Sequence, residues 1–258
     1  MKYYVFCQSD LVLEKAGDDY KIPENPPTEL KPWTTVVNVD GDKAYRIDRP
    51  ITDSERYEMC PLRQSFYKLA EADYRRAGKC HELLYWEQNT KFCGVCGGPM
   101  RFDTDISKKC EHCGKEIWPQ LATAIIVLIS REVPADDGST PRKEVLLVHA
   151  NSFRDNHYGL VAGFVETGET LEEAVYREVM EETGLHIKNL RYFGSQPWPY
   201  PCGLMVGYTA EYDSGQIHLQ RSELSKGAWF NRNNLPHIPE KLSIARQLLD
   251  HWLAKEHD

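Results

Sequence analysis

The stretch GETLEEAVYREVMEETG, residues 168–184, carries more information about the fold than any other part of the chain. At about 100° per residue it forms one helix with a single apolar face. Thr170 and Glu173 match a T-x-x-E capping box, so the helix is expected to begin at Leu171, and Gly184 supplies a left-handed stop. The apolar positions are Leu171, Ala174, Val175 and Val179. The pattern predicts that this face packs inward.

Carboxylates interrupt the apolar face. Glu178 and Glu182 project from its middle, and Glu181 lies at its edge. A solvated surface is the ordinary use of a glutamate-rich helix, but burying unpaired carboxylates beside apolar side chains is costly. Clustered carboxylates also raise one another's pKa unless a cation joins them. The pattern therefore indicates a site for a hard divalent cation, Mg²⁺ or Mn²⁺, of the kind that accompanies phosphate chemistry. Arg177, four residues from both Glu173 and Glu181, can pair with either and orient Glu181.

Length and charge bound the class of protein. The 258 residues are 41% hydrophobic and 27% charged, as in ordinary globular proteins. The sequence has no run of about 18 apolar residues, so a membrane span is not expected. The early charges in MKYYVFCQSDLVLEK do not fit a secretory signal. A cytoplasmic location is therefore expected. The net charge of −8 argues against broad electrostatic adhesion to nucleic acid or membranes. An anionic substrate remains compatible with it, because bound cations reverse the local sign.

Four of the eight cysteines form two C-x-x-C pairs within CGVCGGPMRFDTDISKKCEHCG. Each pair can wrap two thiolates around one ion, and the loop between the pairs allows a tetrahedron. Four thiolates leave no open position for water, so we expect one structural Zn²⁺ per chain. A redox C-x-x-C is the alternative, but neither pair lies at a strand-to-helix junction. The predicted ligands are Cys93, Cys96, Cys110 and Cys113.

The chain is expected to have three parts. Residues 1–90 form an α+β accessory or dimerisation domain with two helical patterns at 61–78 and 80–89. Residues 91–118 form the zinc ribbon, and residues 119–258 form a mixed α/β domain. Its expected strands are 122–130, 144–150, 158–166, 191–195, 204–213 and 216–219, with a turn at the DSG of 213–215 and a closing amphipathic helix at 243–256.

Residues 163–185, GFVETGETLEEAVYREVMEETGL, match the Nudix box G-x5-E-x7-R-E-U-x-E-E-x-G-U without a mismatch, U being a bulky aliphatic residue. The chain therefore resembles the Nudix hydrolases, which cleave nucleoside diphosphates linked to another moiety. The resemblance implies an α/β/α sandwich with a mixed sheet. It also implies that Glu178, Glu181 and Glu182 bind Mg²⁺ or Mn²⁺ with help from the backbone carbonyl of Ala162 or Gly163. Arg177 would orient these carboxylates.

A proline-rich segment follows the box at 195–205, SQPWPYPCGLM. Its alternating prolines favour a stiff, extended chain that presents Trp198 and Tyr200 in fixed directions, with Gln196 available for hydrogen bonds. Rigid aromatic side chains of this kind stack on flat heterocycles. The alternative is that Trp198 and Tyr200 only pack on the zinc ribbon or the N-terminal region.

The same segment resembles the SQPWPFP signature of the NADH pyrophosphatase subfamily, with Tyr200 in place of Phe. That subfamily also carries a four-cysteine ribbon before its Nudix domain. The resemblance covers about 90–258 and implies hydrolysis of NADH, or of NAD⁺, to NMNH or NMN and AMP. It further implies two or three divalent ions per site and a homodimer whose pocket is shared between subunits.

The resemblance also assigns residues outside the box. Glu223 would join the metal site, against the alternative of a surface acid, and Glu178, Glu181 and Glu182 all qualify as general base. The expected substrate-binding residues are Gln196, Pro197, Trp198, Pro199, Tyr200, Pro201, Cys202, Gly203, Phe164, Trp118, Arg63, Asp105 and Ala245. Of these, Phe164, Trp118 and Tyr200 are the candidates for stacking on adenine or nicotinamide.

Two other functions compete with this one. The same site could remove NAD caps from RNA 5′ ends; the acidic balance weakens that possibility, although a basic patch such as YRRAGK could guide RNA. A non-catalytic ligand sensor built on the zinc ribbon and Nudix domain is the other alternative. The intact set of box carboxylates argues against the sensor.

Overall fold

The computed structural model describes residues 1–134, 141–153 and 156–254, and it divides into two compact units. The N-terminal unit comprises Met1–Leu121 together with Trp198–Cys202. The C-terminal unit comprises Ala122–Pro197 and Gly203–Asp258. The segment Trp198–Cys202 therefore belongs to the N-terminal unit although it lies between two strands of the C-terminal unit. The accessory region and the ribbon expected from the sequence both fall within the N-terminal unit.

The N-terminal unit is built on a six-stranded sheet in the order β3-β2-β1-β5-β4, with β6 paired to β2. Its strands are antiparallel except for the parallel pair of β1 and β5. The strands are β1 (Tyr3–Cys7), β2 (Asp10–Ala16), β3 (Asp19–Lys21), β4 (Val37–Val39), β5 (Asp42–Arg46) and β6 (Tyr57–Pro61). Alternate residues of β1 face two different cores, Tyr4 and Phe6 on one side and Tyr3 and Val5 on the other.

One long helix, α1 (Glu71–Asn89), covers the larger of these cores. The two separate helical patterns expected at 61–78 and 80–89 are therefore wrong. A 3₁₀ turn, η1 (Gln64–Tyr67), precedes α1, and no break occurs between the two patterns because Cys80 is fully buried in the same apolar stripe as Ala77 and Leu84. The apolar positions on both sides of the expected boundary serve one continuous helix.

The zinc ribbon forms a small three-stranded antiparallel sheet of β7 (Met100–Thr104), β8 (Ser107–Cys110) and β9 (Glu116–Ile117). Cys93 and Cys96 precede β7, Cys110 is the last residue of β8, and Cys113 lies in the turn between β8 and β9. Lys108 is 2% exposed, and its ammonium donates to the backbone carbonyls of Glu87 and Thr90, which attaches the ribbon to the end of α1.

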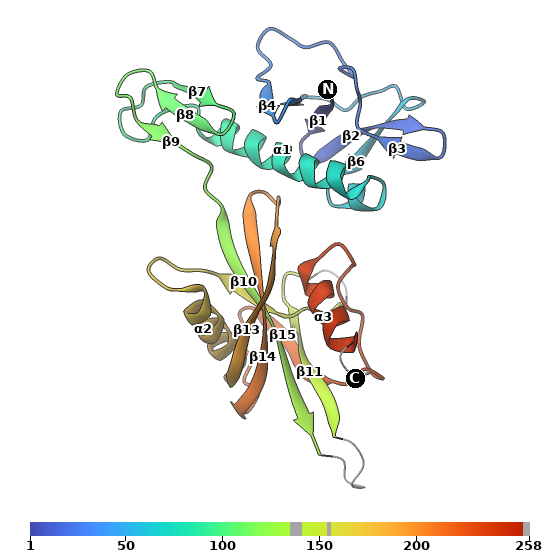
Figure 1. Ribbon diagram of the computed structural model, residues 1–258, viewed down its shortest axis with the longest axis vertical. Helices are drawn as coiled ribbons and strands as arrows, with labels where there is room; N and C mark the ends of the chain where they lie inside the picture. The colour runs from blue at the N-terminus through green and yellow to red at the C-terminus, as the bar shows by residue number, and fades with distance from the viewer. Residues whose placement is uncertain (135–140, 154–155, 255–258) are drawn as a thin grey trace. The chain divides into compact units, whose positions relative to one another are not determined.

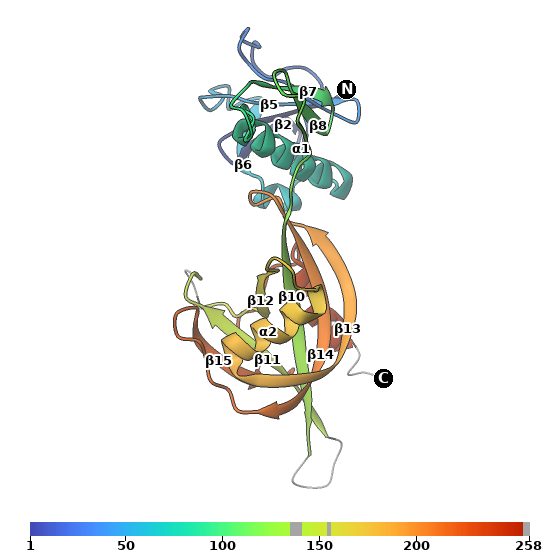
Figure 2. The same cartoon turned by 90° about the vertical axis from the view of Figure 1, so that its left-hand side faces the viewer.

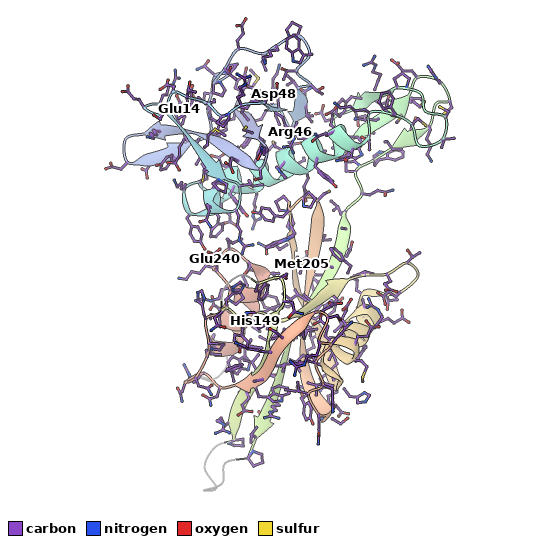
Figure 3. All side chains as sticks on the ribbon, turned by 180° about the vertical axis from the view of Figure 1, so that it is seen from behind. Glu14, Arg46, Asp48, His149, Met205 and Glu240 are labelled. Carbon is purple, nitrogen blue, oxygen red and sulfur yellow. The ribbon has the colours of Figure 1, made fainter. Side chains whose placement is uncertain are left out.

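The C-terminal unit has a mixed six-stranded sheet in the order β13-β14-β10-β11-β15, with β12 also paired to β10. The pair of β10 and β14 is parallel and the others are antiparallel. The strands are β10 (Ala122–Val133), β11 (Arg142–Ala150), β12 (Val161–Phe164), β13 (Leu185–Pro197), β14 (Gly203–Gly215) and β15 (Leu224–Phe230). Figure 3 labels His149 on β11 and Met205 on β14 of this sheet.

Two helices cover the two faces of this sheet (Figure 1). Helix α2 (Leu171–Thr183) packs on the face that includes Ile125 and Val127, and helix α3 (Ile244–Ala254) packs on the face of Ile126 and Leu128. Figure 2 shows α2 lying across the strands. A helix covers each face of the sheet, so the central strands are apolar on both faces. This explains their continuous apolar runs. The expected α/β/α sandwich with a mixed sheet is confirmed.

The expected strand at 216–219 and the turn at 213–215 are wrong. Residues 213–215 continue β14, and the chain then leaves the sheet. The N–H of His218 donates to the carbonyl of Thr183 at 2.8 Å, and the N–H of Gln220 donates to the carbonyl of Glu182 at 3.0 Å. The end of α2 thus takes the hydrogen bonds that a neighbouring strand would otherwise supply. Among the described residues, no helix is both long and apolar enough to cross a membrane.

Candidate active site and zinc site

Helix α2 begins and ends where the sequence predicts. The hydroxyl of Thr170 accepts from the N–H of Glu173 at 3.2 Å, and the Glu173 carboxylate accepts from the N–H of Thr170 at 2.7 Å. Gly184 ends the helix at φ 69°, a left-handed conformation that favours glycine. Ala174, Val175 and Val179 are fully buried, so the predicted inward face is confirmed. This fixed register determines where the glutamates of α2 point.

Arg177 connects four groups. Its guanidinium donates to Glu169 at 2.7 Å, to Glu178 at 2.9 Å, to Glu181 at 3.1 Å and to the carbonyl of Phe164 at 3.0 Å. The predicted pair with Glu181 is confirmed, whereas Glu173 is used by the helix cap. These carboxylates raise the pKa of Arg177, Glu169 contributing most. Sequence reasoning missed Glu169, although it occupies the first fixed glutamate of the box.

Glu178 lies directly against the backbone of β12. A Cβ on Gly163 would lie 2.0 Å from the carboxyl carbon of Glu178, so any other residue there would displace the Glu178 carboxylate. Burial raises the pKa of Glu178, while Arg177 opposes the shift. The first glycine of the box therefore leaves room for the observed position of the Glu178 carboxylate. Ala162 precedes Gly163 on the same strand and pairs with Ile126 of β10.

Glu182 forms the buried end of the carboxylate group, and the exposed Glu223 lies close to it. Glu182 is 4% exposed, and burial followed by the charges of Glu178 and Glu223 raises its pKa to about 8. Glu223 is close enough to Glu182 to contribute to the raised pKa of Glu182. Within the described part of the chain, neither has a salt-bridge partner. The pair is a cluster of acids that lacks a cation of the protein's own.

The segment that leaves β14 positions Glu223. Its carbonyl accepts from the N–H of Asn151 at 2.7 Å, and its own N–H donates to the carbonyl of Gln220 at 2.9 Å. Because Gln220 is bonded to the end of α2, the segment is held against both α2 and the end of β11. Glu223 is therefore brought to Glu182 from a distant part of the sequence. Glu223 itself is exposed in the turn before β15, so its role at the metal site stays a prediction beside the alternative of a surface acid.

The donor set fits a hard divalent cation. Glu178, Glu181, Glu182 and Glu223 offer carboxylate oxygens, and two of these groups are held neutral or at a raised pKa by burial and like charge. Mg²⁺ or Mn²⁺ would remove that penalty. In the described ranges, no three of these carboxylates lie within 4.8 Å of one another, a separation that the four ribbon cysteines do meet. The glutamates are thus spread more widely than the zinc ligands.

The four ribbon cysteines are arranged for a tetrahedral metal. Their sulfurs all lie within 4.8 Å of one another, with Sγ separations of 3.7 Å for Cys93 and Cys113 and 3.5 Å for Cys96 and Cys110. Zinc–sulfur bonds of about 2.3 Å give tetrahedral edges of about 3.8 Å. The N–H groups of Val95 and Cys113 lower the thiol pKa values of Cys93 and Cys110, the latter to about 6. The donor set fits zinc.

The proline-rich segment lies in the N-terminal unit. Tyr200 packs against the core covered by α1, and its hydroxyl lies 2.8 Å from that of Tyr74. The ring of Trp198 lies at 5.0 Å, edge-on, from that of Tyr200, and the Arg63 guanidinium lies over it at 5.5 Å. Of the two uses that the sequence left open for Tyr200, the structure shows packing on the N-terminal core. Arg63 supports Trp198 by a cation–π contact.

Gln196 and Ala245 lie at helix α3. The Gln196 amide donates to the carbonyl of Leu242 and accepts from the N–H of Ile244, both at 2.7 Å. Gln196 therefore uses both ends of its amide to fix the start of α3, and Ala245 is buried in the adjoining core. The expected contacts of both side chains with substrate stay predictions. Its hydrogen bonds make Gln196 the N-terminal anchor of α3.

The other expected substrate residues are divided between the two units. Phe164 is 67% exposed at the end of β12 in the C-terminal unit. Trp118 is 54% exposed in the N-terminal unit, and Asp105 is exposed in the turn between β7 and β8. The remaining members of the proline-rich segment are Pro197 at the end of β13, Pro199 and Cys202, which are buried, Pro201, which is exposed, and Gly203 at the start of β14.

Comparison with known proteins identifies the family. A model of the NUDIX domain matches residues 130–252. A protein of Salmonella paratyphi C named NAD-capped RNA hydrolase NudC is 40% identical over 233 residues, covering 86% of each chain. A protein of the same name from Deinococcus radiodurans is 40% identical over 198 residues, covering 76% of this chain and 69% of that one.

A crystal structure of a NUDIX hydrolase from Nitrosomonas europaea is also similar, at 21% identity and a TM-score of 0.48, covering 65% of this chain and 93% of that one. Family membership rests on the sequence relatives and on the matched domain, which includes α2 and Glu223. The chain belongs to the Nudix hydrolases, in the NADH pyrophosphatase subfamily whose matched relatives are named NAD-capped RNA hydrolase NudC.

Proposed function

We propose that this Nudix hydrolase cleaves the pyrophosphate bond of NADH and NAD⁺, giving NMNH or NMN and AMP. The observation that carries the proposal is the buried carboxyl group of Glu182 beside Glu178 and the exposed Glu223, a set of oxygen donors whose like charges favour a bound cation. Two relatives with 40% identity carry names that refer to NAD-capped RNA, which places the NAD pyrophosphate among their substrates.

The residues of α2 have separate roles in this proposal. Glu178, Glu181, Glu182 and Glu223 would hold two or three Mg²⁺ or Mn²⁺ ions, with the backbone carbonyl of Ala162 or Gly163. When bound, such ions neutralise phosphate charge and lower the pKa of water. Arg177 keeps Glu178 and Glu181 in place through its contacts of 2.9 and 3.1 Å. Glu178, Glu181 and Glu182 remain the candidates for the general base.

Recognition of the dinucleotide is assigned to aromatic side chains. Trp198 is fixed by Arg63 and Tyr200, so its ring is preorganised for stacking on a heterocycle. Phe164 and Trp118 are exposed enough for the same role. Tyr200 contributes as the support of Trp198. We assign one structural Zn²⁺ per chain to the ribbon cysteines, with residues 1–90, 91–118 and 119–258 as accessory, ribbon and catalytic regions of a cytoplasmic homodimer.

Removal of NAD from the 5′ ends of RNA is the second candidate, and the names of the relatives favour it. The net charge of −8 predicts that any RNA affinity arises from a local basic patch. The two candidates share the bond that is cleaved, so they differ in the preferred carrier of the NAD group.

Product analysis tests both candidates. The full chain is incubated at fixed Mg²⁺ or Mn²⁺ with NADH, NAD⁺, an NAD-capped oligonucleotide, ADP-ribose and a diadenosine polyphosphate. We expect NMNH and AMP from NADH. A kcat/KM for the capped oligonucleotide that exceeds that for NADH and falls steeply with salt would favour RNA as the main substrate. Turnover of ADP-ribose alone would contradict both candidates. Sedimentation of the same preparation tests the proposed dimer.

A further inference from the structure

Helix α1 contacts the proline-rich segment along one face. Tyr74, Gly78 and His81 have the spacing i, i+4 and i+7, so they form a single stripe on the helix. Each member of the stripe contacts a different point of Trp198–Cys202, and all of these residues belong to the N-terminal unit. The stripe and the segment therefore pack against each other within that unit.

Gly78 allows the closest approach. A Cβ added at this position would lie 3.1 Å from the Cγ atom of Pro199 and 3.6 Å from its Cβ atom. Pro199 is buried, so it has little room to move away. A glycine inside a helix lowers its stability. Gly78 therefore lowers the stability of α1 but allows the helix to contact the segment closely.

His81 lies against the backbone of the segment. Its side chain is 7% exposed and lies close enough to the carbonyls of Pro199 and Pro201 for both to act on its pKa. Its Nδ1 atom is buried without a hydrogen-bond partner among the described residues. Burial, with the charge of Arg46 on β5 (Figure 3), lowers the pKa of His81 to about 4. The ring is thus neutral throughout the physiological range.

Tyr74 fixes the aromatic part of the segment. Its hydroxyl lies 2.8 Å from that of Tyr200, and the Tyr200 ring in turn meets the Trp198 ring edge-on at 5.0 Å. Arg63, which precedes η1, covers the same indole from the N-terminal unit. The orientation of Trp198 therefore depends on α1 through one intermediate residue.

We propose that α1 positions the stacking tryptophan of the dinucleotide site, with Tyr74, Gly78 and His81 as positioning residues for Trp198. The inference rests on the proposed function, because it takes Trp198 as a residue that stacks on a base of NADH. It assigns to residues 1–90 a role in substrate affinity that is separate from dimerisation and from the chemistry at α2.

Two conservative variants test the role of the stripe. Tyr74→Phe removes one hydroxyl, and Gly78→Ala adds one methyl group against Pro199 while raising helix propensity. Tyr85→Phe, at an exposed position of the same helix, is the matched control. Loss of base stacking in Trp198→Ala sets the scale at roughly 10- to 100-fold in affinity. A partial displacement of the Trp198 ring in Tyr74→Phe or Gly78→Ala should raise KM by about 3- to 10-fold. The value of kcat should stay within about twofold of wild type.

The measurements separate this inference from the proposed function. NADH binding to the metal-free full chain is followed by nicotinamide fluorescence, and NADH hydrolysis gives KM and kcat. We expect weaker binding and raised KM in Tyr74→Phe and Gly78→Ala, with Gly78→Ala unfolding at the same or a higher urea concentration than wild type. A merely structural stripe would lower stability and leave KM unchanged.

Each outcome decides one of the two claims. Hydrolysis by wild type with unchanged NADH affinity in both stripe variants overturns the positioning role and leaves the proposed function intact. Binding without hydrolysis in wild type, with weaker binding in the variants, supports the positioning role and overturns the proposed function. Absence of both binding and hydrolysis in wild type overturns both. Weaker binding in Tyr85→Phe to the same extent would also overturn the positioning role.

Discussion

The carboxylate of Glu178 occupies the space where a side chain on Gly163 would begin. The Cβ of any other residue there would lie 2.0 Å from the Glu178 carboxyl carbon. Gly163 on β12 and Glu178 on α2 are thus in direct contact, and the absence of a side chain on Gly163 allows the Glu178 carboxylate to lie against β12.

Substitution Gly163→Ala should displace Glu178 without unfolding the sheet. Displacement of a reacting group by about 1 Å costs on the order of 100-fold in rate, so kcat/KM for NADH should fall by about that factor. Steady-state kinetics with zinc content and urea unfolding check the result. Wild-type kinetics in Gly163→Ala would show that the position of Glu178 is unimportant.

Glu169 is expected to act through Arg177. Its carboxylate accepts from the guanidinium at 2.7 and 3.0 Å, and Arg177 then holds Glu178 and Glu181. Loss of a partner that orients metal ligands typically costs 10- to 100-fold, so Glu169→Gln should lower kcat/KM by about that range and require more Mg²⁺ for half-maximal rate. The exposed Glu166→Gln is the matched control. Equal effects of the two substitutions would contradict the positioning role.

Glu182 should make the metal-free protein less stable as the pH rises. Its folded pKa of about 8 lies above its ordinary value of 4.5. Between these values the folded state holds a proton that the unfolded state has released, so the free energy of unfolding falls with increasing pH. Glu182→Gln removes this dependence. As the pH rises from 5 to 9, the free energy of unfolding of Glu182→Gln should therefore increase by roughly 2 to 4 kcal/mol relative to that of wild type. Urea unfolding of both metal-free proteins measures it, and parallel pH profiles would argue against a buried acid.

Zinc should be bound by the ribbon alone. Metal analysis of the purified chain should give one zinc per chain, and Cys96→Ser should lower this value because its sulfur lies 3.5 Å from that of Cys110. Cys60→Ser, at a buried thiol outside the ribbon, should keep its zinc. Since four thiolates leave no open position, we expect loss of zinc to reduce the stability of the N-terminal unit. Full zinc content in Cys96→Ser would contradict the assignment.

Sequence reasoning succeeded where a pattern is local. The limits of α2 follow from Thr170, Glu173 and Gly184, which lie within one short stretch, and the inward direction of Glu182 follows from helical periodicity. The four cysteines were equally recognisable, because each pair is contained in a single turn. In these cases the neighbouring residues alone determine the geometry.

Sequence reasoning failed where tertiary contacts choose between alternatives. The bonds of the Gln196 amide to Leu242 and Ile244 at the start of α3 were not expected from the sequence. The use of Tyr200 as packing depends on Tyr74, which is far away in the sequence. Likewise, residues 216–219 resemble a strand, but the end of α2 binds this segment instead. None of these partners is visible in the local pattern.

The most direct test of the central claim is NADH hydrolysis by Glu178→Gln at fixed Mg²⁺, with AMP and NMNH quantified against wild type. The substitution keeps the size of the side chain and its contact with Gly163, so the protein should fold and retain zinc. We predict that wild type releases AMP and NMNH in equal amounts and that kcat/KM in Glu178→Gln falls on the order of 100- to 1000-fold. Wild-type turnover in a folded, zinc-containing Glu178→Gln would contradict the assignment of the α2 carboxylates to catalysis.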